Sequence, residues 1–148
     1  MFIKEKNMNI LFVCTGNTCR SPMAEVMMIE LLKEKGIKGV EVSSAGTSVS
    51  FPSGASYNSI MTMAKKNIDL TSHTSRMLTD GMLSAADAVY TMTRSQAAMV
   101  KRMFPGFSGK VRPLAERDIT DPFGGDLDEY QTCADEIYAG LLNILGGL

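Results

Sequence analysis

The 148 residues of the chain suffice for one ordinary domain with its own hydrophobic core. Hydrophobic residues make up 45% of the chain and charged residues 21%, and the formal net charge is -1, which is a globular composition without the basic excess that favours binding to nucleic acid or anionic membranes. No apolar run approaches the length of a membrane span, about 18 residues, so we expect a single domain over residues 1–148 with neither nucleic-acid nor membrane partners.

The N-terminus resembles a secretory signal only faintly. Two lysines precede an apolar run at residues 10–13, but the run is too short, and Val13 is not the small residue that a processing site requires. Of the three cysteines, Cys14 and Cys19 share one short loop. In a reducing compartment such a pair is more typical of catalysis or metal binding than of a structural disulfide. We therefore expect a cytoplasmic protein.

The first predicted strand and helix flank that loop. Residues 10–14 form a continuous apolar run, as expected of a strand buried on both faces of a parallel sheet. After the polar residues 15–17, a helix is predicted from Ser21 and Pro22, because serine is a good N-cap and proline is tolerated in the first turn. Gly36 is the predicted stop.

The remaining predicted elements continue the alternation of strands and helices. In chain order they are a strand around Val40 and Val42 that ends at Gly46, a helix at about 57–67, a strand at 88–92, a helix at 96–103, a strand at 110–114, a loop at 118–126 and a long last helix. The last helix is marked by apolar residues three or four apart, which are Leu127, Tyr130, Ala134, Ile137, Leu141 and Leu145. This alternation predicts an α/β fold with a mostly parallel sheet.

The loop after the first strand has the features of an anion cradle. In parallel sheets ligands bind at the carboxyl ends of the strands, where Cys14 is placed. Main-chain N–H groups of residues 15–20 can converge on an anion at the positive end of the following helix. Gly16 gives the loop conformational freedom, and the fork of Arg20 matches two oxygens of a tetrahedral anion. Phosphate is the natural occupant, and the residues predicted to bind it or its substrate are Thr15, Gly16, Asn17, Thr18, Cys19, Ser21 and Phe123.

A cysteine at the floor of that cradle can serve as a nucleophile. The positive field favours the thiolate, which is the attacking form. The hydroxyl of Ser21 can donate to the sulfur, and Asn17 can brace the loop. A leaving group needs a proton, and Asp121, in the sequence D-I-T-D-P-F-G-G-D, is the best source because Pro122 stiffens its loop. The ionised carboxylate can then activate water, so this chemistry requires no metal or other cofactor.

Other interpretations of these residues remain open. The two loop cysteines can be ordinary buried thiols or can join Cys133 in a metal site, although Cys133 falls on the apolar side of the last helix, where packing is expected. A lone histidine such as His73 is most often structural. Ser44 can simply terminate a strand. The alternatives to Asp121, which can equally solvate the loop or cap the last helix, are Asp118, Asp126 and Asp128.

The stretch C-T-G-N-T-C-R-S-P, together with D-P-F-G-G far downstream, resembles the low-molecular-weight protein tyrosine phosphatases. The resemblance implies a three-layer sandwich with a four-stranded parallel sheet and a phosphate-binding loop after the first strand, acting as a monomer on phosphorylated proteins. It implies that Cys14 is the nucleophile, Arg20 the phosphate clamp, and Asp121 the general acid and then base. By the same resemblance Cys19 matches the family's second loop cysteine, which can form a disulfide with the nucleophile. The residues that match the family's supporting hydrogen-bond network are Asn17, Ser21, Ser44 and His73.

One position departs from the usual tyrosine phosphatase pattern. Most members carry isoleucine four residues after the nucleophile, whereas this chain has Thr18. A bacterial branch of the family that hydrolyses protein phosphoarginine shows the same threonine and the same D-P-F-G-G. A guanidinium group is planar and polar at its edge, so a hydroxyl from Thr18 and one flat wall from Phe123 suit it. We expect a phosphoarginine phosphatase, with phosphotyrosine as the alternative substrate.

Two rivals come from other functional classes. Arsenate reductases share the fold and the cysteine-arginine loop, but they pass electrons through a further cysteine pair, for which this chain offers only Cys133. A non-catalytic phosphate-binding module would have no use for Cys14 and Asp121 placed as nucleophile and acid.

Overall fold

The computed structural model describes residues 4–148, so the first three residues of the predicted domain lie outside the described part. A parallel sheet of four strands in the order β2-β1-β3-β4 forms its centre. The strands are β1 (Lys4–Cys14), β2 (Ile37–Gly46), β3 (Ala88–Thr91) and β4 (Val111–Pro113). The predicted parallel sheet is confirmed.

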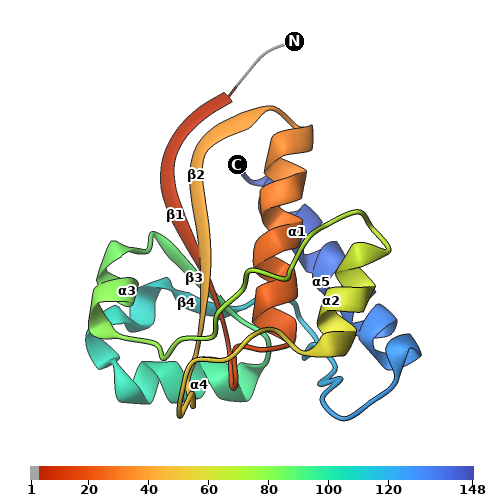
Figure 1. Ribbon diagram of the computed structural model, residues 1–148. Coiled ribbons are helices and arrows are strands. Elements are labelled where there is room, and N and C mark those ends of the chain that lie inside the picture. The colour runs from red at the N-terminus through yellow and green to blue at the C-terminus, as the bar shows by residue number, and fades with distance from the viewer. Residues whose placement is uncertain (1–3) are drawn as a thin grey trace.

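Helices cover both faces of the sheet and complete three layers (Figure 1). On one side lie α1 (Arg20–Glu34), α2 (Tyr57–Ala64) and α5 (Leu127–Gly146), with α1 against β1 and β2 and with α2 packed on α5. On the other side lie α3 (Asp80–Ala85) and α4 (Arg94–Met103), and a 3-10 helix, η1 (Pro105–Lys110), precedes β4. The predicted three-layer α/β sandwich is confirmed.

The central strand β1 is buried on both faces, as its apolar run predicts. Ile10 and Phe12 join the core under α1 and α5, whereas Leu11 and Val13 join the core under α3 and α4. All four are at most 1% exposed. Because successive side chains of a strand point to opposite faces, one continuous apolar run supplies both cores. This burial fixes the end of β1, and therefore Cys14, in a rigid frame.

The structure corrects the predicted start of the first helix. The N-cap of α1 is Cys19, with no side-chain cap, and Ser21 lies inside the first turn. The serine does not cap the helix because its hydroxyl is engaged with Cys14 and Asn17 instead. The first N–H groups of α1 are therefore left without a side-chain acceptor, which suits an anion-binding end.

Several element boundaries also differ from the prediction. β1 and β2 begin earlier than expected, and α2 ends at Ala64, three residues before the predicted end at Asn67. The six-residue elements α3 and η1 were not predicted, because one or two helical turns carry too little periodicity to recognise.

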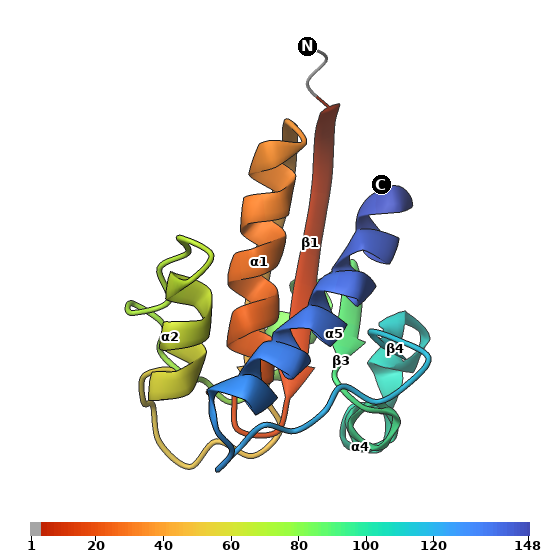
Figure 2. The ribbon, with the colours of Figure 1, turned by 90° about the vertical axis from the view of Figure 1, so that its right-hand side faces the viewer.

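The carboxyl end of β1 lies at the same end of the molecule as the starts of α1 and α5 (Figure 2). Across residues 4–148, none of the helices combines the length and the apolar character needed to cross a membrane.

Candidate active site

The loop between β1 and α1 surrounds a small cavity of about 270 Å³. Every residue from Cys14 to Arg20 contributes to its wall, and Asp121 and Phe123 close it from the opposite side. The structure therefore brings all the predicted nucleophile, clamp, acid and wall residues to one place. A tetrahedral anion with one attached group fits a cavity of this kind at the end of a helix.

Cys14 is 3% exposed at the carboxyl end of β1. Its Sγ lies 2.8 Å from Ser21 Oγ, and the main-chain N–H of Asn17 donates to it at 3.3 Å. Both groups can donate to a negative sulfur, and the start of α1 adds the positive end of a helix dipole. The sulfur is thus surrounded by donors that suit a thiolate.

Asn17 holds the loop in shape from inside. Its φ of 56° lies in the left-handed region, which asparagine adopts more readily than most residues. The side-chain amide donates to Ser21 Oγ at 2.8 Å and to Ser44 Oγ at 3.0 Å. Ser44 in turn donates to Glu25 Oε1 of α1 at 2.7 Å. A buried chain of hydrogen bonds therefore joins α1, the end of β2 and the cysteine loop.

A second segment, residues 73–76, braces the loop from outside. His73 Nε2 donates to the carbonyl oxygen of Asn17 at 2.7 Å, and the N–H of Arg76 donates to Asn17 Oδ1 at 3.0 Å. The guanidinium Nε of Arg76 donates to the carbonyl oxygen of Ser44 at 3.0 Å. His73 and Ser44 therefore support the loop by hydrogen bonds and do not line the cavity.

Sequence reasoning missed Glu25 and Arg76 as members of this network. No local pattern marks either residue, because both meet the loop only through tertiary packing. Glu25 occupies an ordinary helical position of α1, and Arg76 follows a polar loop.

Arg20 and Asp121 face each other across the cavity. Arg20 is nearly buried, and its Nη1 donates to the carbonyl oxygen of Ile119 at 3.0 Å. Its Nη2 lies 3.8 Å from Asp121 Oδ2, and the side chain of Asp121 is 62% exposed. Asp121 Oδ1 also accepts from the N–H of Phe123 at 3.1 Å. The carboxylate is thus close to the clamp but open to a substrate and to water.

The loop that carries Asp121 is fixed at both ends. The N–H of Ile119 donates to the carbonyl oxygen of Met92 at 2.9 Å, which ties the loop to the end of β3. Thr120 donates twice to the carboxylate of Glu136 in α5, at 2.8 and 3.1 Å. Phe123, at the tip of this loop, is 78% exposed beside the cavity. It offers an aromatic wall to any group attached to the bound anion.

The second loop cysteine belongs to a separate hydrogen-bond cluster. Cys19 Sγ lies 3.3 Å from the hydroxyl of Tyr130 in α5 and donates to Ser56 Oγ at 3.5 Å. Burial, together with the hydrogen bond to Cys19, raises the pKa of Tyr130 to about 12. The sequence shows Tyr130 only as part of an apolar stripe, although a buried tyrosine hydroxyl generally needs a polar partner.

Cys133 does not join the site. It is fully buried in the core under α5, and this burial raises the pKa of its thiol to about 12. The residues that the structure describes contain no group of three or more histidine, cysteine, aspartate or glutamate side chains placed to hold a metal ion.

A parallel α/β sheet whose first strand ends in a cysteine-arginine anion loop, faced by an aspartate, defines a cysteine-dependent phosphatase. The family model described as low molecular weight phosphotyrosine protein phosphatase matches residues 9–147. The chain belongs to that family, as its motifs predict.

Individual relatives agree with this assignment. A protein-arginine-phosphatase of Bacillus subtilis is 38% identical over 136 residues, which cover 88% of this chain and 89% of the relative. A protein-arginine-phosphatase of Geobacillus stearothermophilus is 40% identical, covering 86% and 87% of the two chains. The solved structure of the YwlE arginine phosphatase, a mutant with a phosphorylated active-site serine, superposes with a TM-score of 0.90 at 35% identity and covers 95% of each chain.

Proposed function

We propose that this phosphatase hydrolyses phosphoarginine in proteins, through a phosphocysteine intermediate on Cys14. The observation that carries the proposal is the single cavity that brings together Cys14, Arg20, Asp121 and the hydroxyl-bearing Thr18. The nearness to relatives named protein-arginine-phosphatase supports the choice of substrate.

The first chemical step transfers the phosphoryl group to sulfur. The thiolate of Cys14 attacks phosphorus, the P–N bond to the guanidino group breaks, and the carboxylic acid of Asp121 protonates the departing nitrogen. Arg20 and the loop N–H groups hold the phosphoryl oxygens as their charge develops. The separation of 3.8 Å between Arg20 Nη2 and Asp121 Oδ2 supports Asp121 as the acid, because a phosphate held by Arg20 would lie beside this carboxyl group.

The second step returns the enzyme to its starting state. The carboxylate of Asp121 takes a proton from a water molecule, whose oxygen attacks phosphorus while the P–S bond breaks. Ser21, with Oγ 2.8 Å from Cys14 Sγ, donates to the sulfur as it leaves with its negative charge. Phosphate departs, Cys14 is again a thiolate, and Asp121 is again protonated for the next cycle.

The mouth of the cavity suits a guanidino group better than a phenol ring. Thr18 is smaller than isoleucine and provides a hydroxyl for the polar edge of the guanidinium. Phe123 supplies one flat wall, while Gly124 (φ 79°) and Gly125 add no second aromatic side chain. A phosphotyrosine ring would gain from the apolar flank that Thr18 does not offer.

The cysteines speak against the arsenate reductase alternative. The electron relay of an arsenate reductase needs further thiols that can reach the cysteine loop and become thiolates. Cys133, the third and last cysteine, is fully buried, and burial raises its pKa to about 12. The composition and cysteine usage are in keeping with a cytoplasmic protein, and we propose the monomer as its working form.

Substitutions at Thr18 test the choice of substrate. Thr18→Val removes the hydroxyl and keeps the branched shape, Thr18→Ile adds apolar bulk, and Thr18→Ser restores the hydroxyl alone. We expect kcat/KM for phosphoarginine peptides to fall in the first two and to recover in the third, with phosphotyrosine turnover rising most in Thr18→Ile. An unchanged ratio of the two substrates across all three variants would remove Thr18 from the account.

A further inference from the structure

The strand β2 has an open edge away from the cysteine loop. β2 pairs with β1 on one side only, since it ends the strand order. On its other side the short segment 76–78 pairs with Gly46, whose N–H donates to the carbonyl of Arg76 at 2.9 Å and whose carbonyl accepts from the N–H of Leu78 at 2.8 Å. Main-chain groups of a strand point alternately to the two sides. Three further residues therefore point their main chain outward with Gly46, and these are Val40, Val42 and Ser44.

Most of this outward main chain is unoccupied. The carbonyl of Ser44 accepts from Arg76 Nε, but within residues 4–148 no hydrogen bond outside the ladder is seen for the main chain of Val40 or Val42. The register shift of the β1–β2 ladder comes earlier, just before Val40. The open stretch from Val40 to Ser43 is thus regular, and at a rise of about 3.3 Å per residue it spans roughly 13 Å, enough for an added strand of about four residues.

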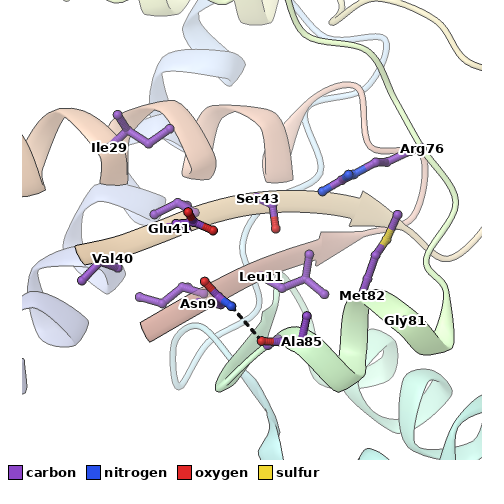
Figure 3. A pocket seen from close by; sticks show the side chains of 13 residues that line it. Asn9, Leu11, Ile29, Val40, Glu41, Ser43, Arg76, Gly81, Met82 and Ala85 are labelled. Atoms are coloured by element: carbon purple, nitrogen blue, oxygen red, sulfur yellow. Dashed lines mark hydrogen bonds between the residues drawn. The ribbon is translucent and has the colours of Figure 1, made fainter. Parts of the chain in front are cut away.

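Two hollows lie beside this edge and meet at Ile29 and Val40. The larger, about 700 Å³, lies between the strands and α3, and among its walls are Leu11, Glu41, Ser43, Arg76 and Met82 (Figure 3). The smaller, about 330 Å³, lies against α1, and among its walls are Leu32, Lys33, Ile37 and Lys38. Side chains of an added strand would therefore have room beside β2, mainly in the larger hollow, which runs along Val40 to Ser43.

The charge around the edge is mostly positive. Lys33, Lys38 and Arg76 line the hollows, against the single carboxylate of Glu41. Lys33 lies 4.0 Å from Glu30, but in the described part of the chain no acidic group pairs with Lys38 or Arg76. Unpaired cations beside open main-chain groups complement an acidic extended segment.

A second copy of this chain fits the edge less well. Two β2 strands paired about a two-fold axis at Glu41, the middle residue from Lys38 to Ser44, would set the two Glu41 side chains directly opposite each other. The unpaired lysine and arginine charges would also gain no partner. Like charges oppose association in this register, so charge favours an acidic partner over this pairing.

We propose that the open edge of β2, from Val40 to Ser43, binds an extended acidic segment of a partner protein as an added strand. The segment forms main-chain hydrogen bonds with Val40 and Val42, and its acidic side chains meet Lys38 and Arg76. This surface is separate from the cysteine loop, so the segment binds while the phosphate cavity stays free.

A displayed library of random heptapeptides, selected on the protein with inorganic phosphate present, tests the proposal. We expect selected peptides to alternate apolar with Asp or Glu residues and to shift the amide resonances of Val40 and Val42. The double substitution Lys33→Glu and Lys38→Glu should weaken binding at least tenfold. Val42→Pro, which removes one outward N–H from an edge strand, should do the same. The double substitution Lys101→Glu and Arg102→Glu, at two exposed residues of α4, is the matched control and should bind normally.

Turnover of p-nitrophenyl phosphate should stay within twofold of wild type in the charge-reversed protein and its control, so a failed docking surface is distinguishable from a failed catalytic assignment. The proposal is overturned if no peptide is selected, if the selected peptides are not acidic, or if the resonance shifts centre on the cysteine loop. Reversible self-association in sedimentation that protects the Val42 amide would assign the edge to a second copy instead.

Discussion

Replacing Asn17 tests how the cysteine loop is held in shape. The side chain makes three hydrogen bonds, two buried ones with Ser21 Oγ and Ser44 Oγ and a partly buried one with the N–H of Arg76. At a net value of about 1 kcal/mol each, their loss costs about 3 kcal/mol of unfolding free energy. Alanine at the φ of 56° adds about 1 kcal/mol of strain, which glycine avoids. We expect Asn17→Ala to lose about 4 kcal/mol and Asn17→Gly about 3 kcal/mol.

Urea unfolding at neutral pH gives the free energy of each variant, and turnover of p-nitrophenyl phosphate reports on the loop. Both variants should also lose kcat, because the Asn17 N–H that donates to Cys14 Sγ depends on the loop's shape. Asn17→Ser, which keeps a short polar side chain, should fall between wild type and Asn17→Gly. A loss below about 1 kcal/mol for Asn17→Ala, or a greater loss for glycine than for alanine, would refute the reasoning about bonds and strain.

Further predictions concern the acid and the buried titrating groups. Asp121→Asn should slow aryl phosphates with poor leaving groups far more than those with good ones, and equal slowing would show that Asp121 is not the acid. Rapid quenching of the same variant should trap phosphate on Cys14, detected as an adduct of intact mass, whereas no adduct would contradict a covalent intermediate. Because the pKa of Tyr130 is raised to about 12 from 10.0, the stability it contributes below pH 10 is lost as the pH rises toward 12. This amounts to at most about 3 kcal/mol, and Tyr130→Phe should flatten the fall in unfolding free energy over that range.

The sequence predicted what depends on local pattern. The apolar run of β1 and the periodic apolar stripe of α5 are reliable predictors of these elements. Burial on both faces of a strand, or on one face of a long helix, leaves a recognisable pattern in the sequence. The cysteine loop was also recognisable, since its residues are contiguous from Cys14 to Ser21. Asp121 was found because proline and glycine mark its loop.

What the sequence did not predict depends on contacts between distant segments. Glu25, Arg76 and Tyr130 reach the loop through the packing of α1, the segment 73–76 and α5, and no spacing encodes those distances. The N-cap prediction at Ser21 was wrong for a related reason. A capping serine and a serine that donates to the nucleophile look the same in sequence, and only the folded loop distinguishes them.

The most direct test of the central claim is the turnover of matched peptides that carry either phosphoarginine or phosphotyrosine, with Cys14→Ser as the inactive blank. The account predicts a kcat/KM at least tenfold higher for the phosphoarginine peptide and no turnover of either peptide by the blank. A higher kcat/KM for phosphotyrosine would contradict the proposed substrate while leaving the cysteine mechanism in place, and turnover by Cys14→Ser would contradict the mechanism itself.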